Sequence, residues 1–398
     1  RRIVDGYPCP AVAFPPAHVG LNLVFLVPGE TGGMEVAARE LIVALVAVAP
    51  EVRFTAFVNR EAARAGDGPW GQLIPSVTVP VRARSRAQWV AGEQALLPVL
   101  ADRAGVDVLH SLGSTAPARG AARRVVTIHD LIYRRFPEAH PGLRNLGMRV
   151  LVPLAAHRAD RVIADSQSTR ADLIDELGLA PGKVDVIPLG LGSVRRTAGL
   201  DPAQTRARFG LGERRVLLSL SAKRPHKNLG ALIDALALIP LWRRPVLVLP
   251  GYATWHETAL RAHAEQAGVS DDVRFLSWLD EAELEGLWGV SGAFVYPSLY
   301  EGFGLPILEA MARGLPVACS DRSSLPEVAG DAALLFDPSD PAAIARAIER
   351  LLGDRALAER LRAAGRDRAA GFTWERAARE TLAVYARVLG EPRRSAPA

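Results

Sequence analysis

Cysteine and lysine are both scarce in this sequence. Its only cysteines are Cys9 and Cys319, too few for a disulfide framework, and it has no Cys-x-x-Cys pair or Cys/His cluster of the kind that binds zinc. Only three of its 48 basic residues are lysine, at positions 183, 223 and 227. The first scarcity excludes a disulfide-stapled module and fits a reducing cytosol. The second draws attention to each lysine, because an ammonium and a guanidinium recognise ligands differently.

Several other features are missing. No segment approaches 18 uninterrupted apolar residues, so we expect no membrane-spanning helix, and residues 1–20 lack the apolar stretch of a signal peptide. The patterns G-x-x-x-x-G-K-[ST] and G-x-G-x-x-G do not occur, which removes the fingerprints of ATPases and Rossmann dehydrogenases. No basic stretch is interleaved with aromatic residues, so nucleic acid is not an expected partner.

The composition is that of a folded protein with two cores. The chain has 398 residues, of which 49% are apolar and 23% charged, and a single core stops growing at roughly 250 to 300 residues. The net charge of +5 comes from the first half, because residues 1–198 contain 23 basic and 18 acidic side chains. Such an excess can draw that half to an anionic acceptor or a membrane surface, although scattered solvated arginines explain it as well.

Short apolar runs, each followed by a helical pattern, predict an α/β protein with two parallel sheets. The first series comprises residues 21–27, 106–110, 125–129 and 161–164, and the second comprises 216–220, 246–249, 273–275, 293–296 and 316–318. The hinge is expected within residues 189–213, which are rich in glycine and arginine and contain the helix-start signal Asp201-Pro202. Ligands of such sheets bind outside the carboxyl ends of the strands, which predicts a site between the two domains.

The strongest local signal is the segment from Tyr300 to Ala310, YEGFGLPILEA, which follows an apolar run and leads into a helical pattern. Its glycines let the backbone approach a ligand closely, Pro306 suits the first turn of a helix, and the free amides of that turn favour an anion. Glu301 lies in the loop and Glu309 one turn into the helix. Two carboxylates beside an anion site indicate hydrogen bonds from sugar hydroxyls; a solvated loop glutamate and a helix-surface glutamate are the alternative.

A second signal, SAKRPHKNL from Ser221 to Leu229, also lies between an apolar run and a helical pattern, which Asn228 could cap. Two of the three lysines, Lys223 and Lys227, lie here beside Arg224. A diphosphate leaving group needs cations that stay fixed while its charge develops. The segment therefore predicts a diphosphate site, with a structural role as the alternative, above all for Lys223 and Arg224.

Two weaker signals lie in the first half. Gly32 and Gly33 separate an apolar run from a helical pattern, and such a pair either cradles phosphate or simply makes a tight turn. His129 ends the run 125–129, where it could position a substrate hydroxyl or transfer a proton, although a lone histidine is more often structural. The same reservation applies to His110, which ends another run.

Together these segments resemble glycosyltransferase family 4, the retaining family with the GT-B fold. The resemblance covers about residues 21–389. It rests on the Gly32-Gly33 turn, His129-Asp130, the stretches ADRVIADS (159–166) and VIPLG (186–190), the PHKN segment (225–228) and the E-x7-E block from Glu301 to Glu309. It implies two Rossmann-like doubly wound domains facing each other across a cleft. The expected parts are an N-terminal extension (1–20), an acceptor-binding domain (21–198), a nucleotide-sugar-binding domain (199–375), a C-terminal helix packing back on the first domain (376–390) and a tail (391–398).

The resemblance also implies roles for single residues. Glu301 would bind hydroxyls of the transferred sugar, Glu309 the donor ribose and Lys227 the diphosphate, while His129 would lie near the reacting centre. Glu301, His129 and Lys227 would thus be the catalytic residues. Many members carry an arginine where this chain has Ser221, so Lys223 or Arg224 would supply the second cation. The remaining donor-binding residues would be Gly32, Gly33, Ser221, Gly302, Phe303, Gly304 and Leu305.

The activity that the resemblance implies is transfer of a hexose, with retained configuration, from a nucleotide diphosphate sugar to a hydroxyl of a saccharide, lipid-linked or natural-product acceptor. No cofactor and no metal would be required. The PHKN form favours GDP-mannose as donor and cell-envelope polysaccharide synthesis as the setting. The expected location is the cytoplasm or the inner face of the membrane. The basic first half of the chain would make the contact with that membrane surface. A sugar-nucleotide epimerase on the same fold and a catalytically silent donor-binding partner stay open as alternatives.

Overall fold

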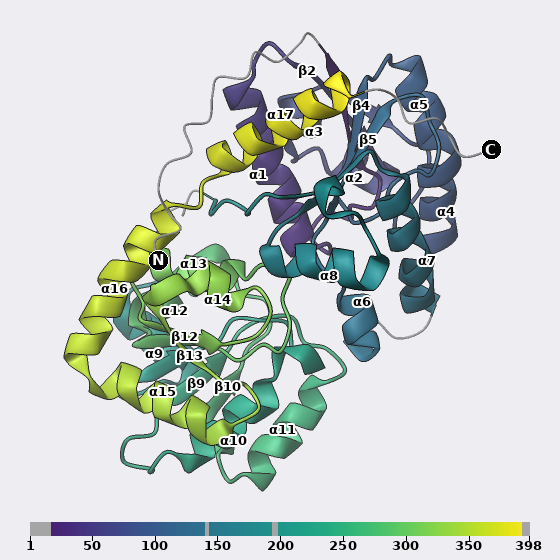
Figure 1. Ribbon diagram of the computed structural model, residues 1–398. Coiled ribbons are helices and arrows are strands. Elements are labelled where there is room, and N and C mark those ends of the chain that lie inside the picture. Colours follow the sequence, from purple (N-terminus) through teal and green to yellow (C-terminus); the bar gives the residue numbers. More distant parts are fainter. Residues whose placement is uncertain (1–16, 140–142, 193–197, 392–398) are drawn as a thin grey trace. The chain divides into compact units, whose positions relative to one another are not determined.

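The computed structural model describes residues 17–139, 143–192 and 198–391, which form two α/β units (Figure 1). The first unit contains the described residues up to Leu131, Leu146–Gly190 and those from Thr373 onward, and the second contains Ile132–Asn145 and Leu191–Phe372. The division therefore lies at Gly190 rather than at residue 198. Of the residues that the sequence assigns to the first domain, 132–139 and 143–145 belong to the second unit.

The first unit is built on a seven-stranded sheet in which every neighbouring pair is parallel. The strand order is β3-β2-β1-β4-β5-β6-β7. The strands are β1 (His18–Leu23), β2 (Arg53–Val58), β3 (Ser76–Thr78), β4 (Val108–Ser111), β5 (Arg123–Ile128), β6 (Arg161–Ala164) and β7 (Val184–Val186). All of β1 and β4 is buried, as expected for a parallel sheet that helices cover on both faces.

Helices of the first half of the chain connect these strands. They are α1 (Gly33–Val48), α2 (Arg60–Ala65), α3 (Pro69–Gln72), α4 (Arg86–Ala91), α5 (Leu97–Arg103), α6 (Ile132–Arg135), α7 (Leu143–Arg158) and α8 (Gln167–Leu177). Asn59 caps α2 and Ser166 caps α8, each side chain accepting a backbone N–H of the first turn.

The first strand differs from its prediction at both ends. It begins at His18, inside the segment 1–20 that the sequence assigns to an extension, and it ends at Leu23 rather than Val27. Asn22 is the physical reason for the early end: its side-chain oxygen accepts the N–H of Val24, at 3.0 Å, and turns the backbone out of the ladder. Asn59 then donates to the carbonyl oxygens of Val24 and Leu26, which fixes the turn.

The last helix, α17 (Trp374–Gly390), belongs to the first unit although it follows the second in sequence. It packs along α1 (Figure 1), and its residues from Trp374 to Val388 join the core formed by β1, β2 and α1. The buried Tyr385 hydroxyl lies 2.6 Å from Nδ1 of His110 on β4, and Nε2 of His110 lies 2.8 Å from Oγ1 of Thr127 on β5. His110 therefore has a structural role, and burial lowers its pKa to about 3.

The second unit is built on a six-stranded parallel sheet with the order β10-β9-β8-β11-β12-β13. Its strands are β8 (Val216–Leu218), β9 (Val246–Leu249), β10 (Val273–Phe275), β11 (Ala293–Tyr296), β12 (Val317–Ser320) and β13 (Ala333–Phe336). Its helices are α9 (Pro202–Phe209), α10 (Leu229–Leu238), α11 (Glu257–Gln266), α12 (Glu281–Val290), α13 (Leu305–Ala312), α14 (Leu325–Ala329), α15 (Pro341–Gly353) and α16 (Arg355–Ala370). Two parallel sheets with connecting helices confirm the predicted α/β class.

The helix-start signal at the beginning of the second unit is confirmed. Asp201 caps α9 through hydrogen bonds from the N–H groups of Ala203 and Gln204, as the Asp201-Pro202 signal predicts. Throughout the described ranges, no helix is both long and apolar enough to cross a membrane.

Candidate functional site

The two strongest sequence signals meet at the switch point of the second sheet. After β8 the chain continues to β9 on one side, whereas β11 flanks β8 on the other. Ligands of doubly wound sheets bind at such a point, outside the carboxyl ends of the strands. The segment 221–227 follows β8 and the segment 301–309 follows β11, so the topology brings both signals to one place.

Lys227 and Glu301 are in direct contact there. The Lys227 ammonium donates to Oε1 of Glu301 at 2.6 Å, and the two side chains are 15% and 13% exposed. The same ammonium lies 3.2 Å from the hydroxyl of Tyr296, the last residue of β11, and 5.6 Å from the centre of its ring. The pair is thus partly screened from water but not sealed, which suits a site that must admit a charged ligand.

The PHKN segment is fixed by Asn228, but not as a helix cap. Residues Pro225–Lys227 form one 3-10 turn, and Asn228 adopts a left-handed conformation with φ 55°. Its side chain makes no cap hydrogen bond; instead Nδ2 donates to the carbonyl oxygens of Pro297, at 3.2 Å, and Pro338, at 2.8 Å. The sequence expectation of a cap is therefore wrong, because the amide ties the Lys227 turn to the loop after β11.

The Glu301 loop is held by two serines from the loop before α14. Ser323 and Ser324 both donate to the carbonyl oxygen of Glu301, at 2.7 and 3.0 Å, and Ser324 also donates to that of Phe303, at 2.6 Å. Gly304 has φ 118° at the N-cap of α13, a conformation that side chains other than glycine rarely adopt. Pro306 lies in the first turn, as the sequence predicts. Gly302 and Leu305 are partly exposed, whereas Phe303 is buried.

Glu309 carries a carboxylate to which no described residue donates a hydrogen bond. Burial is the main cause that raises its pKa; Arg313 opposes this, and the Glu285 carboxylate adds to it. Arg313 is engaged elsewhere, because its Nε donates to Glu285 at 3.1 Å and its guanidinium lies 5.0 Å from the centre of the Trp288 ring. The Glu309 carboxylate is therefore available to accept hydrogen bonds from hydroxyl groups.

Lys223 is buried in the fold, whereas the sequence suggests that it faces the diphosphate. Its side chain is fully buried, and its ammonium donates to the carbonyl oxygens of Gly251, at 2.6 Å, and Leu276, with Glu257 at 3.7 Å. Burial lowers its pKa. The structure thus corrects the expectation for Lys223, because this ammonium joins the loops after β9 and β10 and does not face a ligand.

Arg224 and Ser221 lie on either side of that buried lysine and are both partly exposed. The carbonyl of Ser221 packs so closely on Gly251 that a Cβ there would lie 2.1 Å from its oxygen. Of the two candidate cations that the sequence offers in place of the missing arginine, only Arg224 stays a prediction.

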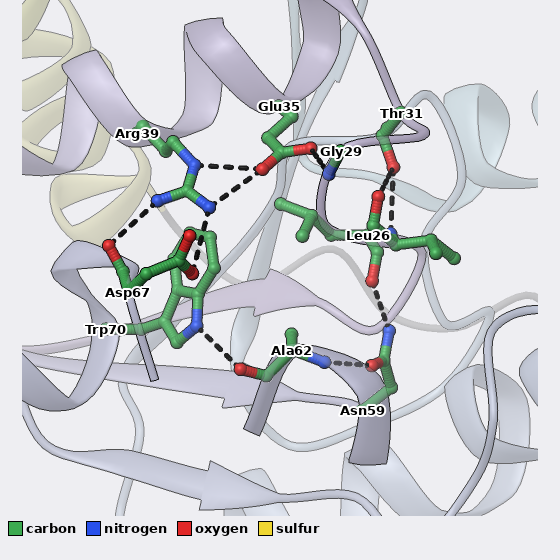
Figure 2. A network of polar contacts seen from close by, with 10 residues as sticks. Leu26, Gly29, Thr31, Glu35, Arg39, Asn59, Ala62, Asp67 and Trp70 are labelled. Atoms are coloured by element: carbon green, nitrogen blue, oxygen red, sulfur yellow. Dashed lines mark hydrogen bonds and ion pairs between the residues drawn. The ribbon is translucent and has the colours of Figure 1, made fainter. Parts of the chain in front are cut away.

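In the first unit, a network of side chains holds the loop that leads into the Gly32-Gly33 turn, and Figure 2 shows this network. Gly32 has φ 66°, and α1 begins at Gly33. Oε2 of Glu35 accepts the N–H of Gly29 at 2.8 Å, while Oε1 accepts both Nε and Nη2 of Arg39 at 2.9 and 2.8 Å. The hydroxyl of Thr31 closes the turn against the backbone of Val27.

Arg39 is itself anchored away from the turn. It donates to the backbone oxygen of Asp67 at 3.1 Å and lies 4.8 Å from the centre of the Trp70 ring (Figure 2). The contacts therefore run from Trp70 through Arg39 and Glu35 to the backbone N–H of Gly29, in the loop before Gly32. The sequence offers no signal for this network beyond the spacing of Glu35 and Arg39 on one helix face.

His129 is fixed by contacts at both ring nitrogens. Nδ1 lies 2.6 Å from the buried carboxylate of Asp165 and Nε2 lies 3.0 Å from the carbonyl oxygen of Leu112. Burial lowers its pKa, but the charge and hydrogen bond of Asp165 outweigh this, helped by Leu112 and Asp130, and raise the pKa to about 9. Both partners are acceptors, so the ring is a cation near neutral pH. This arrangement favours an electrostatic or positioning role over that of a proton acceptor.

Sequence reasoning missed three contributors to these contacts. Tyr296 reads as the end of a buried strand, and Asp165 belongs to a matched stretch without a role of its own. Glu285 lies on a helix far from either motif. Only the position of Tyr296 and Asp165 at strand ends, in a sheet whose strand ends meet, could have drawn attention to them. No group of three or more potential metal ligands occurs within the described residues.

Family models match both halves of the chain. Residues 31–192 match the model "Glycosyltransferase Family 4", and residues 203–368 match "Glycosyl transferases group 1". With the two parallel sheets, these matches define a glycosyltransferase of the GT-B fold.

Similar proteins narrow this to one family. The O-antigen chain mannosyltransferase B of Escherichia coli is 33% identical over 268 residues, covering 66% of this chain and 70% of that protein. A D-inositol 3-phosphate glycosyltransferase of Frankia alni is 33% identical over 313 residues, covering 76% and 73%. The chain belongs to glycosyltransferase family 4.

Other matches cover less of the relative or show the fold alone. The serotype-specific mannosyltransferase WbdA of Escherichia coli is 33% identical over 280 residues, which is 67% of this chain but only 34% of that protein. Among solved structures, sucrose-phosphate synthase from Thermosynechococcus elongatus has a TM-score of 0.74 at 22% identity, covering 94% of this chain and 99% of that one. The Anabaena protein HepE in complex with UDP and glucose has a TM-score of 0.73 at 21% identity, covering 93% and 100%.

Proposed function

We propose that the protein is a retaining mannosyltransferase that moves mannose from GDP-mannose to a hydroxyl of a saccharide or lipid-linked acceptor, without a metal. The observation that carries the proposal is the contact between Lys227 and Glu301 at the switch point, with the unpaired Glu309 eight residues further along. Mannose is favoured as the sugar because several similar proteins are mannosyltransferases. These include O-antigen chain mannosyltransferase B, WbdA and the MMP α-(1→4)-mannosyltransferase of Mycolicibacterium hassiacum.

Each site residue binds a different part of the donor. Lys227, with Arg224 as the second cation, holds the diphosphate and stabilises the charge that develops on it. Glu309 accepts hydrogen bonds from the ribose hydroxyls, and Glu301 accepts hydrogen bonds from hydroxyls of the transferred sugar. Glycine at 302 and 304 lets the backbone amides approach the sugar and phosphate. Because fixed cations and amides meet the charge of the leaving group, the reaction needs no metal and no cofactor.

In the proposed reaction, an acceptor oxygen bonds to the anomeric carbon on the face from which the bond to the diphosphate oxygen breaks. The configuration is therefore retained. The proton of the acceptor hydroxyl passes to the departing diphosphate, so no side chain has to act as the base. His129, held as a cation by Asp165, contributes charge and position in the first unit. The reaction takes place in the cytoplasm or at the inner face of the membrane, where the basic first half favours an anionic surface.

The test is thermal stabilisation of the purified protein by GDP, UDP, ADP and dTDP and their sugars, first with a chelator and then with magnesium. Stabilisation by GDP-mannose in the chelator, lost in Glu309→Ala, supports the proposal. If only a nucleotide other than GDP stabilises the protein, guanine is the wrong base for the donor. No stabilisation by any nucleotide, or conversion of the donor alone to a second nucleotide sugar, contradicts it.

A further inference from the structure

Tyr296 is a buried tyrosine whose hydroxyl lies at the donor site rather than in an apolar surrounding. It is the last residue of β11 and only 2% exposed. Its hydroxyl lies 3.2 Å from Nζ of Lys227, and the same ammonium donates to Glu301 at 2.6 Å. The hydroxyl therefore contacts the ammonium of the charged pair at the switch point.

Packing alone does not require this hydroxyl. Phe294, two residues earlier on the same strand, is fully buried, and its ring stacks on that of Tyr296 with the centres 5.9 Å apart. Phenylalanine would fill the same volume at position 296. A buried hydroxyl costs free energy unless it has a hydrogen-bond partner, and the Lys227 ammonium supplies one here.

The Tyr296 hydroxyl is neutral near neutral pH. Burial, followed by the charges of Glu301 and Glu309, raises the pKa of Tyr296 well above its usual value of 10.0. The oxygen of a neutral phenol can accept from the Lys227 ammonium while the same ammonium donates to the Glu301 carboxylate. Both interactions can then exist at once, which ties three side chains into one unit.

These contacts fix the orientation of the Lys227 ammonium. An ammonium has three N–H donors in fixed geometry. One donates to Glu301 at 2.6 Å and a second to Tyr296 at 3.2 Å, which leaves one for a ligand. Without the tyrosine hydroxyl, a single contact would hold the flexible lysine side chain, and its ammonium would rotate about that contact.

We propose that Tyr296 is a positioning residue of the donor site, whose hydroxyl holds the Lys227 ammonium against Glu301 so that its remaining N–H points at the diphosphate. The inference rests on the proposed function, because Lys227 must be the cation that the diphosphate meets. It deepens that function by assigning a role to a residue outside both sequence motifs.

The first experiment compares Tyr296→Phe with a matched control, Tyr385→Phe, by titration calorimetry with GDP and GDP-mannose in a chelator. Each variant loses one buried hydroxyl, and that of Tyr385 contacts His110 in the first unit. Loss of a hydrogen bond to a charged group is expected to weaken binding of both ligands about tenfold in Tyr296→Phe. Tyr385→Phe should bind as the wild type does. Thermal unfolding without nucleotide shows whether each variant is folded.

The second experiment separates positioning from general stability. If the hydroxyl acts through Lys227, Tyr296→Phe causes no further loss in a Lys227→Ala background, whereas independent effects would add. The inference is overturned if Tyr296→Phe binds GDP as the wild type does, or if its loss is the same with and without Lys227. If the wild type itself binds no nucleotide, the proposed function fails first, and the inference falls with it.

Discussion

The two units treat the charged side chains at their strand ends differently. In the second unit, Lys227 and Glu301 come from separate loops and stay partly exposed, and Glu309 has no donor among the described residues. In the first unit, His129 is paired with a buried carboxylate and Glu35 is used by the backbone of Gly29 and by Arg39. Substitutions in the second unit should therefore change ligand binding, and those in the first should change stability and loop geometry.

The largest effect is expected for Lys227→Ala. Removal of the proposed diphosphate cation should weaken nucleotide binding at least about a hundredfold, the loss of a strong charged contact. The protein should stay folded but melt earlier, because Glu301 and Tyr296 both lose a largely buried partner. Calorimetric titration and a thermal melt measure the two quantities.

Lys183→Ala is the matched control. Lys183 is buried in the first unit, where its ammonium donates to the carbonyl oxygen of His157 at 2.8 Å. This variant should melt earlier and bind nucleotide normally. The comparison between the units would fail if Lys183→Ala weakened binding as much as Lys227→Ala.

Lys223→Met sharpens the comparison, because this lysine lies in the second unit but has a structural role. The substitution keeps the apolar stem and leaves the buried carbonyl oxygens of Gly251 and Leu276 without their donor. The free energy of unfolding should fall by about 2 to 4 kcal/mol. Urea denaturation measures it, and a fall within experimental error would show that the ammonium is not needed by the fold.

The pair of His129 and Asp165 should make stability depend on pH. The pKa of His129 is raised from 6.5 to about 9 in the folded protein, so its contribution is fully present below pH 6.5 and is lost as the pH rises through about 9. The loss is on the order of 2 to 3 kcal/mol. Urea denaturation from pH 6 to 9.5 should show this fall in the wild type and not in Asp165→Asn.

Asp234→Asn is the control for that series. Asp234 is paired with His263 at 2.7 Å, but both side chains are well exposed, at 44% and 39%. Exposed pairs contribute little, so this variant should follow the wild-type curve. Equal curves for the wild type and Asp165→Asn would contradict the assignment of His129 as a cation.

The smallest effect is expected for Glu35→Gln. The amide oxygen can still accept the N–H of Gly29, but the ion pair with Arg39 is lost. Because the Arg39 side chain is 25% exposed, the free energy of unfolding should fall by no more than about 1 kcal/mol. Glu375→Gln removes a more exposed pair, with Arg379, and should change it less. A larger loss in Glu375→Gln would contradict the role given to the Glu35 network.

The sequence predicted five of the six strands of the second unit, because each of these is a short apolar run bounded by turn residues, but it did not predict β13. The runs 246–249, 273–275 and 293–296 agree with β9, β10 and β11 to the residue. In the first unit, β2 and β3 carry no comparable signal: β3 is three residues long and mostly exposed. The early end of β1 depends on the side chain of Asn22, which apolar periodicity does not register.

The candidate site shows a similar contrast. Lys227, Glu301 and Glu309 could be named because each lies in a dense local motif, and the topology then placed both motifs at one switch point. The role of Lys223 could not be read in the same way, because its partners Gly251 and Leu276 are remote in sequence. Composition and spacing indicate which residues are unusual, whereas burial decides whether a charge faces a ligand or the fold.

The measurement that tests the central claim most directly is calorimetric titration of GDP-mannose in a chelator into the wild type, Glu309→Ala and Lys183→Ala. If the second unit holds the donor as proposed, the wild type and Lys183→Ala bind equally and Glu309→Ala binds at least about tenfold more weakly, through loss of its hydroxyl contacts. Equal binding by all three proteins would place the donor elsewhere and contradict the assigned site.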